Sequence, residues 1–268
     1  MSIRERFEDY TDRLLRSVSA YDEVEGLVLL GSTAATERVD AWSDHDFYLV
    51  VAPGTEEHFR TDLAWLPDQD QIGFSARETE HGLKVVYRSG QVLEFAVANA
   101  SDLTGFGGSP FRVVLDRTTV TERMAAARVP RPGDGDDLAD LRIFLALLVI
   151  GVGRAARGEE LVAGELLRVY AVRRLTDLLR RHAEPVPGVS ADPYNPLRRF
   201  ESAYPRWGRT LGEVLAQPAT QCGRSLLDLA DAELAPRWPG YPQAEADLTR
   251  AVIGQSQEGH EESQGRHA

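Results

Sequence analysis

The sequence predicts an α+β protein, with a mixed β-sheet and helices in its first part and an α-helical bundle in its second. Two observations lead to this expectation. Apolar, β-branched runs bounded by turn residues occur up to residue 98, whereas apolar residues recur at helical spacing beyond a Pro-, Gly- and Asp-rich segment. We expect a first domain at 1–126, a linker at 127–137, a helical bundle at 138–250 and a disordered tail at 251–268.

Composition limits the classes of function. The chain has 268 residues, a formal net charge of -12 and 43% hydrophobic residues, which is typical of a globular protein. Because binding along a phosphate backbone needs a basic face, we expect no nucleic acid partner. Cys222 is the only cysteine, so neither a disulfide framework nor a multi-thiolate zinc site is expected.

Five segments account for the expected elements of the first part. Apolar residues at helical spacing predict a helix in 2–20, and a continuous apolar run ending in Gly-Ser predicts a buried strand in 24–32. A second strand follows in 46–52 and a short helix in 55–65. The strongest signal is a β-hairpin in 83–98, where two β-rich runs flank a short Ser-Gly turn.

The second part contains apolar stripes typical of packed helices. These stripes predict helices in 137–159, 161–182, 197–217 and 225–234. The most apolar run, 141–153, is shorter than the ~20 residues needed to span a bilayer, so we expect a core helix there. Since the first residues carry charges throughout, they do not predict a signal peptide, and we expect a cytoplasmic protein without membrane contact.

Three carboxylates stand out in the predicted sheet. Asp44 and Asp46 flank His45 at the start of a strand, and residues i and i+2 of a strand project from the same face. Glu94 lies in an otherwise apolar strand, on the face opposite Leu93 and its apolar neighbours. If the two strands are adjacent, the three acids form a cluster suited to Mg²⁺, which prefers oxygen ligands and shares them with substrate phosphates. Taken alone, an Asp-x-Asp pair is more often a solvated strand entry.

The first strand ends in Gly31-Ser32, twelve residues before the acidic pair begins. A Gly-Ser turn at a strand end brings backbone N–H groups and a hydroxyl towards an anion. An apolar residue, Gly-Ser, about a dozen residues and then Asp-x-Asp in a strand resembles the signature of nucleotidyltransferases of the DNA polymerase β superfamily. The segment around Glu94 is similar to the later strand that carries the third acid in that superfamily. The motif covers roughly residues 26–100.

The layout as a whole resembles the aminoglycoside and lincosamide adenylyltransferases, in which a helical bundle follows the catalytic domain. The resemblance implies that residues 1–126 form a nucleotidyltransferase catalytic domain using two Mg²⁺ ions and ATP or another NTP. It implies catalytic and metal-binding roles for Asp44, Asp46 and Glu94, and nucleotide-binding roles for Gly31, Ser32, Arg38 and Lys84. Relatives commonly carry an apolar residue at the position of His45, where we expect a structural, neutral imidazole.

The expected reaction moves an NMP, AMP from ATP in the first instance, to a hydroxyl of a small molecule such as an aminoglycoside-like antibiotic. Acids of the helical part could bind a cationic acceptor; the candidates are Asp136, Asp137, Asp140, Glu159, Glu160 and Glu165. For each of them taken singly, helix capping or a place on a solvated helix face is the more ordinary role. One alternative is nucleotidyl transfer to a protein partner, as in antitoxin-like members. The others are a degenerate nucleotide-binding or regulatory protein and a metal-stabilised protein of another role. Acceptor, base and oligomeric state stay open.

Overall fold

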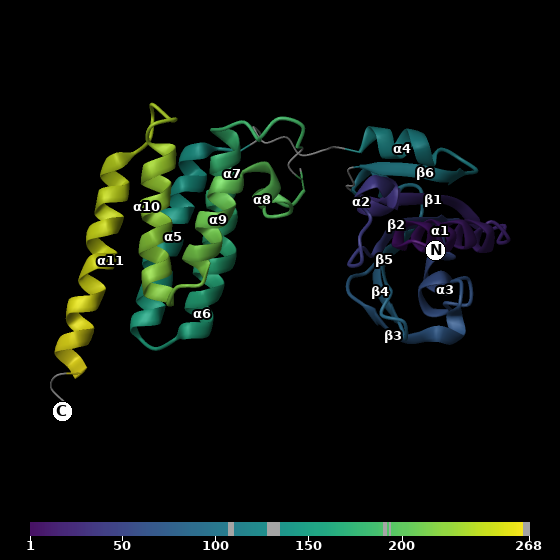
Figure 1. Ribbon diagram of the computed structural model, residues 1–268, viewed down its shortest axis with the longest axis horizontal. Helices are drawn as coiled ribbons and strands as arrows, with labels where there is room; N and C mark the ends of the chain where they lie inside the picture. The colour runs from purple at the N-terminus through teal and green to yellow at the C-terminus, as the bar shows by residue number, and fades with distance from the viewer. Residues whose placement is uncertain (107–109, 128–134, 190–191, 193, 265–268) are drawn as a thin grey trace. The chain divides into compact units, whose positions relative to one another are not determined.

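The chain divides into two compact units, Met1–Val129 and Pro130–Ala268, each of which is described by itself (Figure 1). The computed structural model describes residues 1–106, 110–127, 135–189, 192 and 194–264, with side chains up to 254. The first unit holds a six-stranded mixed sheet and the second is helical, so the expected α+β class is confirmed. Most of the expected linker, 128–134, lies outside the described residues.

The sheet of the first unit has the strand order β3-β4-β5-β2-β1-β6. Its strands are β1 (Val24–Leu30), β2 (His45–Val51), β3 (Ile72–Arg77), β4 (Gly82–Tyr87), β5 (Val92–Ala98) and β6 (Phe111–Asp116). Neighbouring strands pair antiparallel except β2 and β5, which are parallel. That parallel pair joins the two halves of the sheet and brings the predicted strands of Asp46 and Glu94 side by side.

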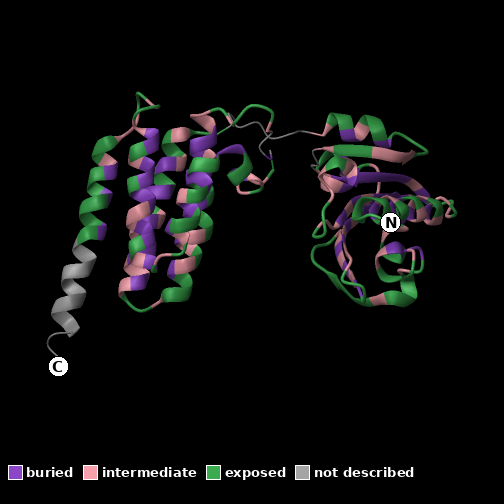
Figure 2. Ribbon diagram, in the orientation of Figure 1, coloured by how far each residue is buried: buried purple, intermediate pink, exposed green. Residues whose placement is uncertain are grey.

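Helices cover the two faces of this sheet unequally. The helical segments are α1 (Ile3–Val18), α2 (Gly31–Ala34), η1 (Thr36–Arg38), α3 (Glu56–Thr61), η2 (Gln69–Gln71), η3 (Asp102–Thr104) and α4 (Val120–Ala126). On one face, α1 and α3 pack on the larger core, which includes Leu14, Phe47 and Phe59. On the other, α4 and η3 cover a smaller core around Val50 and Met124. Buried residues accordingly concentrate in the central strands (Figure 2).

The expected elements of the first unit are present, together with two strands and several short helical segments that were not expected. Strands β3 and β6 form the two edges of the sheet, and their residues are mostly exposed or half-buried. An edge strand with little buried surface lacks the apolar alternation by which strands are recognised. The segments α2 and α4 are only four and seven residues long, too short for a helical period to be visible.

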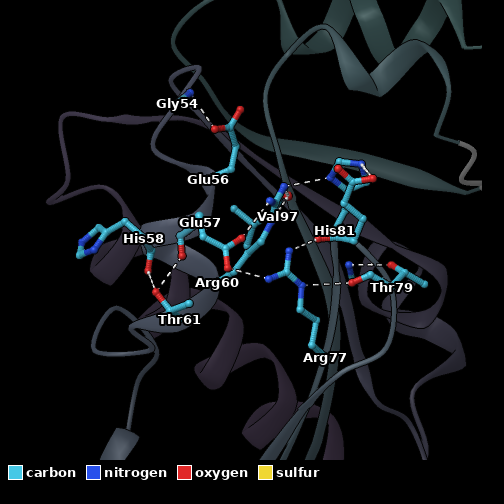
Figure 3. A network of polar contacts seen from close by, with 12 residues as sticks. Gly54, Glu56, Glu57, His58, Arg60, Thr61, Arg77, Thr79, His81 and Val97 are labelled. Carbon is cyan, nitrogen blue, oxygen red and sulfur yellow. Dashed lines mark hydrogen bonds and ion pairs between the residues drawn. The ribbon is translucent and has the colours of Figure 1, made fainter.

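An arginine with a largely buried side chain fixes the end of β5 against α3. The Arg60 side chain is only 9% exposed, and its guanidinium donates to the Val97 carbonyl oxygen at 2.7 and 3.1 Å and contacts His81 Nδ1 at 2.9 Å. Glu57 accepts from Arg77 at 2.6 Å and from Arg60 at 3.4 Å, which links α3 to the strands as well (Figure 3). These charge-assisted bonds hold the strand that carries Glu94 in its place in the sheet.

The second unit is helical throughout its described residues, as expected for the bundle. Its elements are α5 (Asp137–Ala156), α6 (Glu160–Glu165), η4 (Leu166–Ala171), α7 (Val172–Arg181), α8 (Phe200–Ala203), α9 (Pro205–Leu215), α10 (Ala219–Leu234) and α11 (Gln243–Gln264). One face of α5 is buried, including Leu141, Phe144 and Leu148, which confirms the expected core helix. The segment expected as one helix in 161–182 is interrupted by η4, a π-helical stretch.

The C-terminal helix is longer than the sequence predicts. Helix α11 continues to Gln264, where the sequence predicts a tail without structure from residue 251. The segment is rich in Gln and Glu, which have high helix propensity, and holds no proline. Within the part of the chain that is described, no helix is both long and apolar enough to cross a membrane.

Two glycines of α5 give a matched test of its packing. A Cβ on Gly151 would lie 2.7 Å from Leu167 atoms, whereas one on Gly153 would meet nothing within 4 Å. We expect Gly151→Ala to lower the free energy of unfolding by about 1–3 kcal/mol through overpacking. Gly153→Ala should raise it by up to about 1 kcal/mol, since alanine is the better helix former. Urea unfolding measures both, and equal effects of the two variants would contradict this packing.

Candidate active site

The acidic pair lies where β2 begins, on the less covered face of the sheet. Along this strand, His45 and Phe47 are buried while Asp44 and Asp46 are half-buried, so burial alternates as the sequence predicts. Asp46 shares its face with Tyr48 and Val50, which belong to or contact the smaller core. The pair therefore stands at the start of a strand whose remaining residues are anchored in both cores.

Strand register aligns Asp46 with two further charged residues. Glu94 of β5 is the direct partner of Asp46 in the parallel pair, and Lys84 of β4 is the direct partner of Glu94 on its other side. Side chains of directly paired residues project from the same face, about 5 Å apart. The Lys84 ammonium lies 3.7 Å from Glu94 Oε1 and 2.8 Å from Glu78 Oε1. Its hydrogen bond to Glu78 raises the pKa of Lys84, so the side chain carries a positive charge.

Glu94 has the orientation expected from the sequence. Its neighbours Leu93, Phe95 and Val97 are buried in the larger core, at no more than 2% exposure. Glu94 points to the opposite face, and its side chain is 46% exposed. A carboxylate in the middle of an apolar strand is thus accounted for by its access to solvent and by the ammonium of Lys84.

A buried hydroxyl that the sequence did not single out ties α2 to the acidic pair. Thr33 is 1% exposed, and its Oγ1 accepts from the Asp46 N–H at 2.9 Å. The same hydroxyl donates to the Asp44 carbonyl oxygen at 3.4 Å. Thr33 thereby fixes the backbone on both sides of His45. Its place directly after Gly31-Ser32 was the only available signal, and threonine there is an ordinary turn residue.

The Gly-Ser turn and Arg38 lie between β1 and the acidic pair. Gly31 has φ +52°, a conformation that favours glycine, and its N–H donates to the Pro110 carbonyl oxygen at 3.2 Å. That N–H is therefore engaged, whereas the Ser32 side chain is half-buried at the start of the short α2 turn. Arg38 is the last residue of η1, and its Nε lies 3.7 Å from Glu37 Oε1.

His45 has a structural environment, as expected. It is 2% exposed and stacks on the Phe7 ring with centroids 3.7 Å apart. Its Nε2 lies 3.1 Å from the Phe7 carbonyl oxygen, and because a carbonyl only accepts, Nε2 carries the proton. Nδ1 lies 3.4 Å from the Gln91 amide nitrogen, which can donate to it. Burial lowers the pKa of His45 to about 4, so the ring is neutral at pH 7.

The acids offer oxygen ligands of the kind that Mg²⁺ prefers. Among the residues that the structure describes, however, no three His, Cys, Asp or Glu side chains converge closely enough to enclose a metal ion. Mg²⁺ is usually held by one or two carboxylates together with substrate phosphates and water, not by a complete protein cage. The donors at Asp44 and Asp46 fit that mode of binding.

A cavity near the acidic pair does not contain these acids. It has a volume of about 710 Å³ and lies at the same end of the sheet, on the side of His45 and α1. Ser43 and His45 line it, together with Phe7, Tyr10 and Trp42. Because His45 and Asp46 point to opposite faces, the cavity and the acidic pair are separated by the start of β2.

Among the acids of the second unit that were named above, Asp136 caps a helix, and most of the others form ion pairs or hydrogen bonds. Asp136 caps α5 by accepting from the Ala139 N–H at 3.0 Å. Asp137 and Asp140 both pair with Arg181, at 2.5 and 2.7 Å. Glu159 forms an ion pair with Arg154 at 2.6 Å. Glu165 accepts a hydrogen bond from the Tyr170 hydroxyl at 3.1 Å, and Glu160 lies in the first turn of α6.

No protein-family model matches the chain, and no curated protein is significantly similar to it. Among solved structures, an aminoglycoside 6-adenyltransferase from Bacillus subtilis matches with 14% identity, a TM-score of 0.38 and coverage of 95% of this chain and 98% of the other. The CD-NTase CdnG of Bradyrhizobium diazoefficiens, solved with GTP, matches with 15% identity, a TM-score of 0.30 and coverage of 94% and 92%.

A STING-associated CdnE c-di-GMP synthase from Capnocytophaga granulosa matches with 10% identity, a TM-score of 0.30 and coverage of 98% of this chain and 82% of the other. The first of these structures is an adenylyltransferase, the class of enzyme that the Gly-Ser and Asp-x-Asp motif resembles. Likenesses this distant carry no argument about catalysis or substrate, and the chemistry has to be inferred from the residues of this chain.

The Thr33 hydroxyl can be tested by matched substitutions. Thr33→Val keeps the shape but removes the acceptor for the Asp46 N–H, and Thr33→Ser keeps the acceptor. We expect amide exchange at Asp46 to become about 10-fold faster in Thr33→Val, as the loss of a hydrogen bond worth ~1.4 kcal/mol would cause. Exchange should stay near the wild-type rate in Thr33→Ser. NMR-detected hydrogen exchange measures this, and unchanged protection in the valine variant would contradict the contact.

His45 predicts a loss of stability at low pH. Its pKa falls from 6.5 to about 4 on folding, so between these values the unfolded chain binds more protons than the folded one. The contribution is complete above pH 6.5 and decreases as the pH falls towards 4, by about 3 kcal/mol in all. Urea unfolding from pH 7 to 4 should show this loss in the wild type and in a variant of the exposed histidine, His58→Leu. A variant His45→Leu with the same pH dependence would refute the assignment.

Proposed function

We propose that the protein is a Mg²⁺-dependent nucleotidyltransferase that moves an NMP, AMP from ATP in the first instance, to a hydroxyl of a small molecule. The observation that carries this proposal is the direct pairing of Asp46 with Glu94 on one face of the sheet. Asp44 adds a third carboxylate two residues before Asp46, and the Gly31-Ser32 turn leads into the hydroxyl that fixes the pair. An aminoglycoside-like antibiotic is the acceptor to examine first, and we place the reaction in the cytoplasm.

In the proposed site, Asp44 and Asp46 hold Mg²⁺, which neutralises charge on the triphosphate when bound. Ser32 and Arg38 contact the terminal phosphates, Ser32 by its hydroxyl and Arg38 by its guanidinium. Gly31 allows the turn that brings them near and has its own N–H engaged elsewhere.

The transfer itself exchanges one oxygen–phosphorus bond for another. The acceptor oxygen forms a bond to the α-phosphorus while the bond between the α-phosphorus and its bridging oxygen breaks, and pyrophosphate leaves. Glu94, half-exposed beside the pair, takes the proton of the acceptor hydroxyl. Most of the rate enhancement comes from positioning and from charge neutralisation, which is why the rigid register of β2 and β5 matters.

The experiment is pyrophosphate release with Mg²⁺, each of the four NTPs and a panel of aminoglycosides and lincosamides. Asp46→Asn should lower release at least about 100-fold, because it removes a negative charge from the proposed metal site. Asp12→Asn, the same chemical change on the exposed side of α1, should leave release unchanged.

Release within a few-fold of the wild type in Asp46→Asn would refute the site. Label transferred from the NTP to a protein, with none on any small acceptor, would replace the proposed acceptor class. Absence of release with every NTP and acceptor, with nucleotide binding retained, would favour the binding or regulatory role.

A further inference from the structure

Lys84 is the only lysine among the 30 Lys and Arg residues of the chain. It lies on β4 in direct register with Glu94, and β5 separates it from the strand of Asp46. An ammonium is a compact point charge with three donors, whereas a guanidinium is a planar fork. The other strongly basic residues of the chain are arginines, and the one compact ammonium, that of Lys84, lies next to Glu94, the third acid of the proposed site.

The ammonium is held between two carboxylates. Its nitrogen is 2.8 Å from Glu78 Oε1, at the turn after β3, and 3.7 Å from Glu94 Oε1. The side chain is 40% exposed, so it is open to solvent and to a ligand on this face. Glu78 keeps the ammonium near Glu94 without burying it.

Three observations bear on the number of metal ions that the site can hold. Two carboxylates at the start of β2 are enough for one Mg²⁺ that also binds phosphates. A second ion would need Glu94, which already has a cation beside it. A site for two bridged ions would favour three acids that converge around a common point, and no three acids of the described residues do so.

We propose that Lys84 supplies the second positive charge of the site. Its ammonium stands beside Glu94 where the expected second Mg²⁺ would be, so that the protein takes a single divalent ion, at Asp44 and Asp46. When a nucleotide binds, Lys84 turns from Glu78 to an oxygen of the phosphate under attack and remains next to Glu94. This inference rests on the proposed nucleotidyl transfer, and it replaces the expectation of two ions.

The test counts bound ions directly. The full chain is dialysed to equilibrium against Mn²⁺ and a non-hydrolysable ATP analogue, and the excess of Mn²⁺ on the protein side gives the number of ions bound per chain, including the ion shared with the nucleotide phosphates. We expect one protein-dependent Mn²⁺ in the wild type. Lys84→Met should take up a second ion, because Glu94 loses its cation, whereas Lys84→Arg should still take one.

A matched control removes a cation from the same strand region. Arg88 follows β4 and is exposed, so Arg88→Met should still take one ion. Pyrophosphate release provides a second measurement. In Lys84→Met it should fall about 100-fold at low Mn²⁺ and rise with the square of the Mn²⁺ concentration, while the wild type follows the first power.

The outcomes separate this inference from the proposed function. Two ions in the wild type, or one in Lys84→Met, overturn the role of Lys84; if pyrophosphate is still released, nucleotidyl transfer stands without it. No Mn²⁺ binding together with no pyrophosphate release in the wild type overturns both. One ion in the wild type and Arg88→Met with two in Lys84→Met supports the single-ion site.

Discussion

The parallel pairing of β2 with β5 is the constraint on which the rest of the first unit depends. It is the one parallel contact among the described strands, and it joins the β1–β2 side of the sheet to the β3–β4–β5 side. A shift of one residue would turn every side chain of a strand to the other face. Asp46 would then face Phe95 in the larger core, and its carboxylate would be desolvated at a large free-energy cost.

Three side chains anchor this register, two at the start of β2 and one at the end of β5. At the start of β2, Thr33 and His45 bind the backbone to α2 and to α1. At the end of β5, Arg60 binds Val97 to α3. The polar face between them is consequently presented by a rigid scaffold, which is how sites that act by positioning are generally built.

The sequence predicted the central strands and the face on which Glu94 lies, because those positions obey strong local rules. Buried strands are recognised by continuous apolar runs. The face of the sheet on which Glu94 lies followed from the apolar residues next to it in the sequence, which are buried on the opposite face. The face of Lys84 did not follow, because it depends on which residue of β5 lies opposite, a relation set by the hairpin as a whole. Thr33 was missed for a similar reason. Its role comes from a contact with a residue thirteen positions away, which no local pattern encodes.

The irregular outer strand has a consequence for solubility. β3 is at the edge of the sheet, it is exposed along most of its length, and Phe74 is 63% exposed. A regular edge of this kind invites another chain to add a strand. The register of β3 shifts between Ile72 and Phe74, where Gly73 lets the backbone approach Val86. Such a bulge bends and twists the strand. A second copy could not continue the hydrogen-bond ladder of β3 in register, so the backbone opposes self-association at this edge of the sheet.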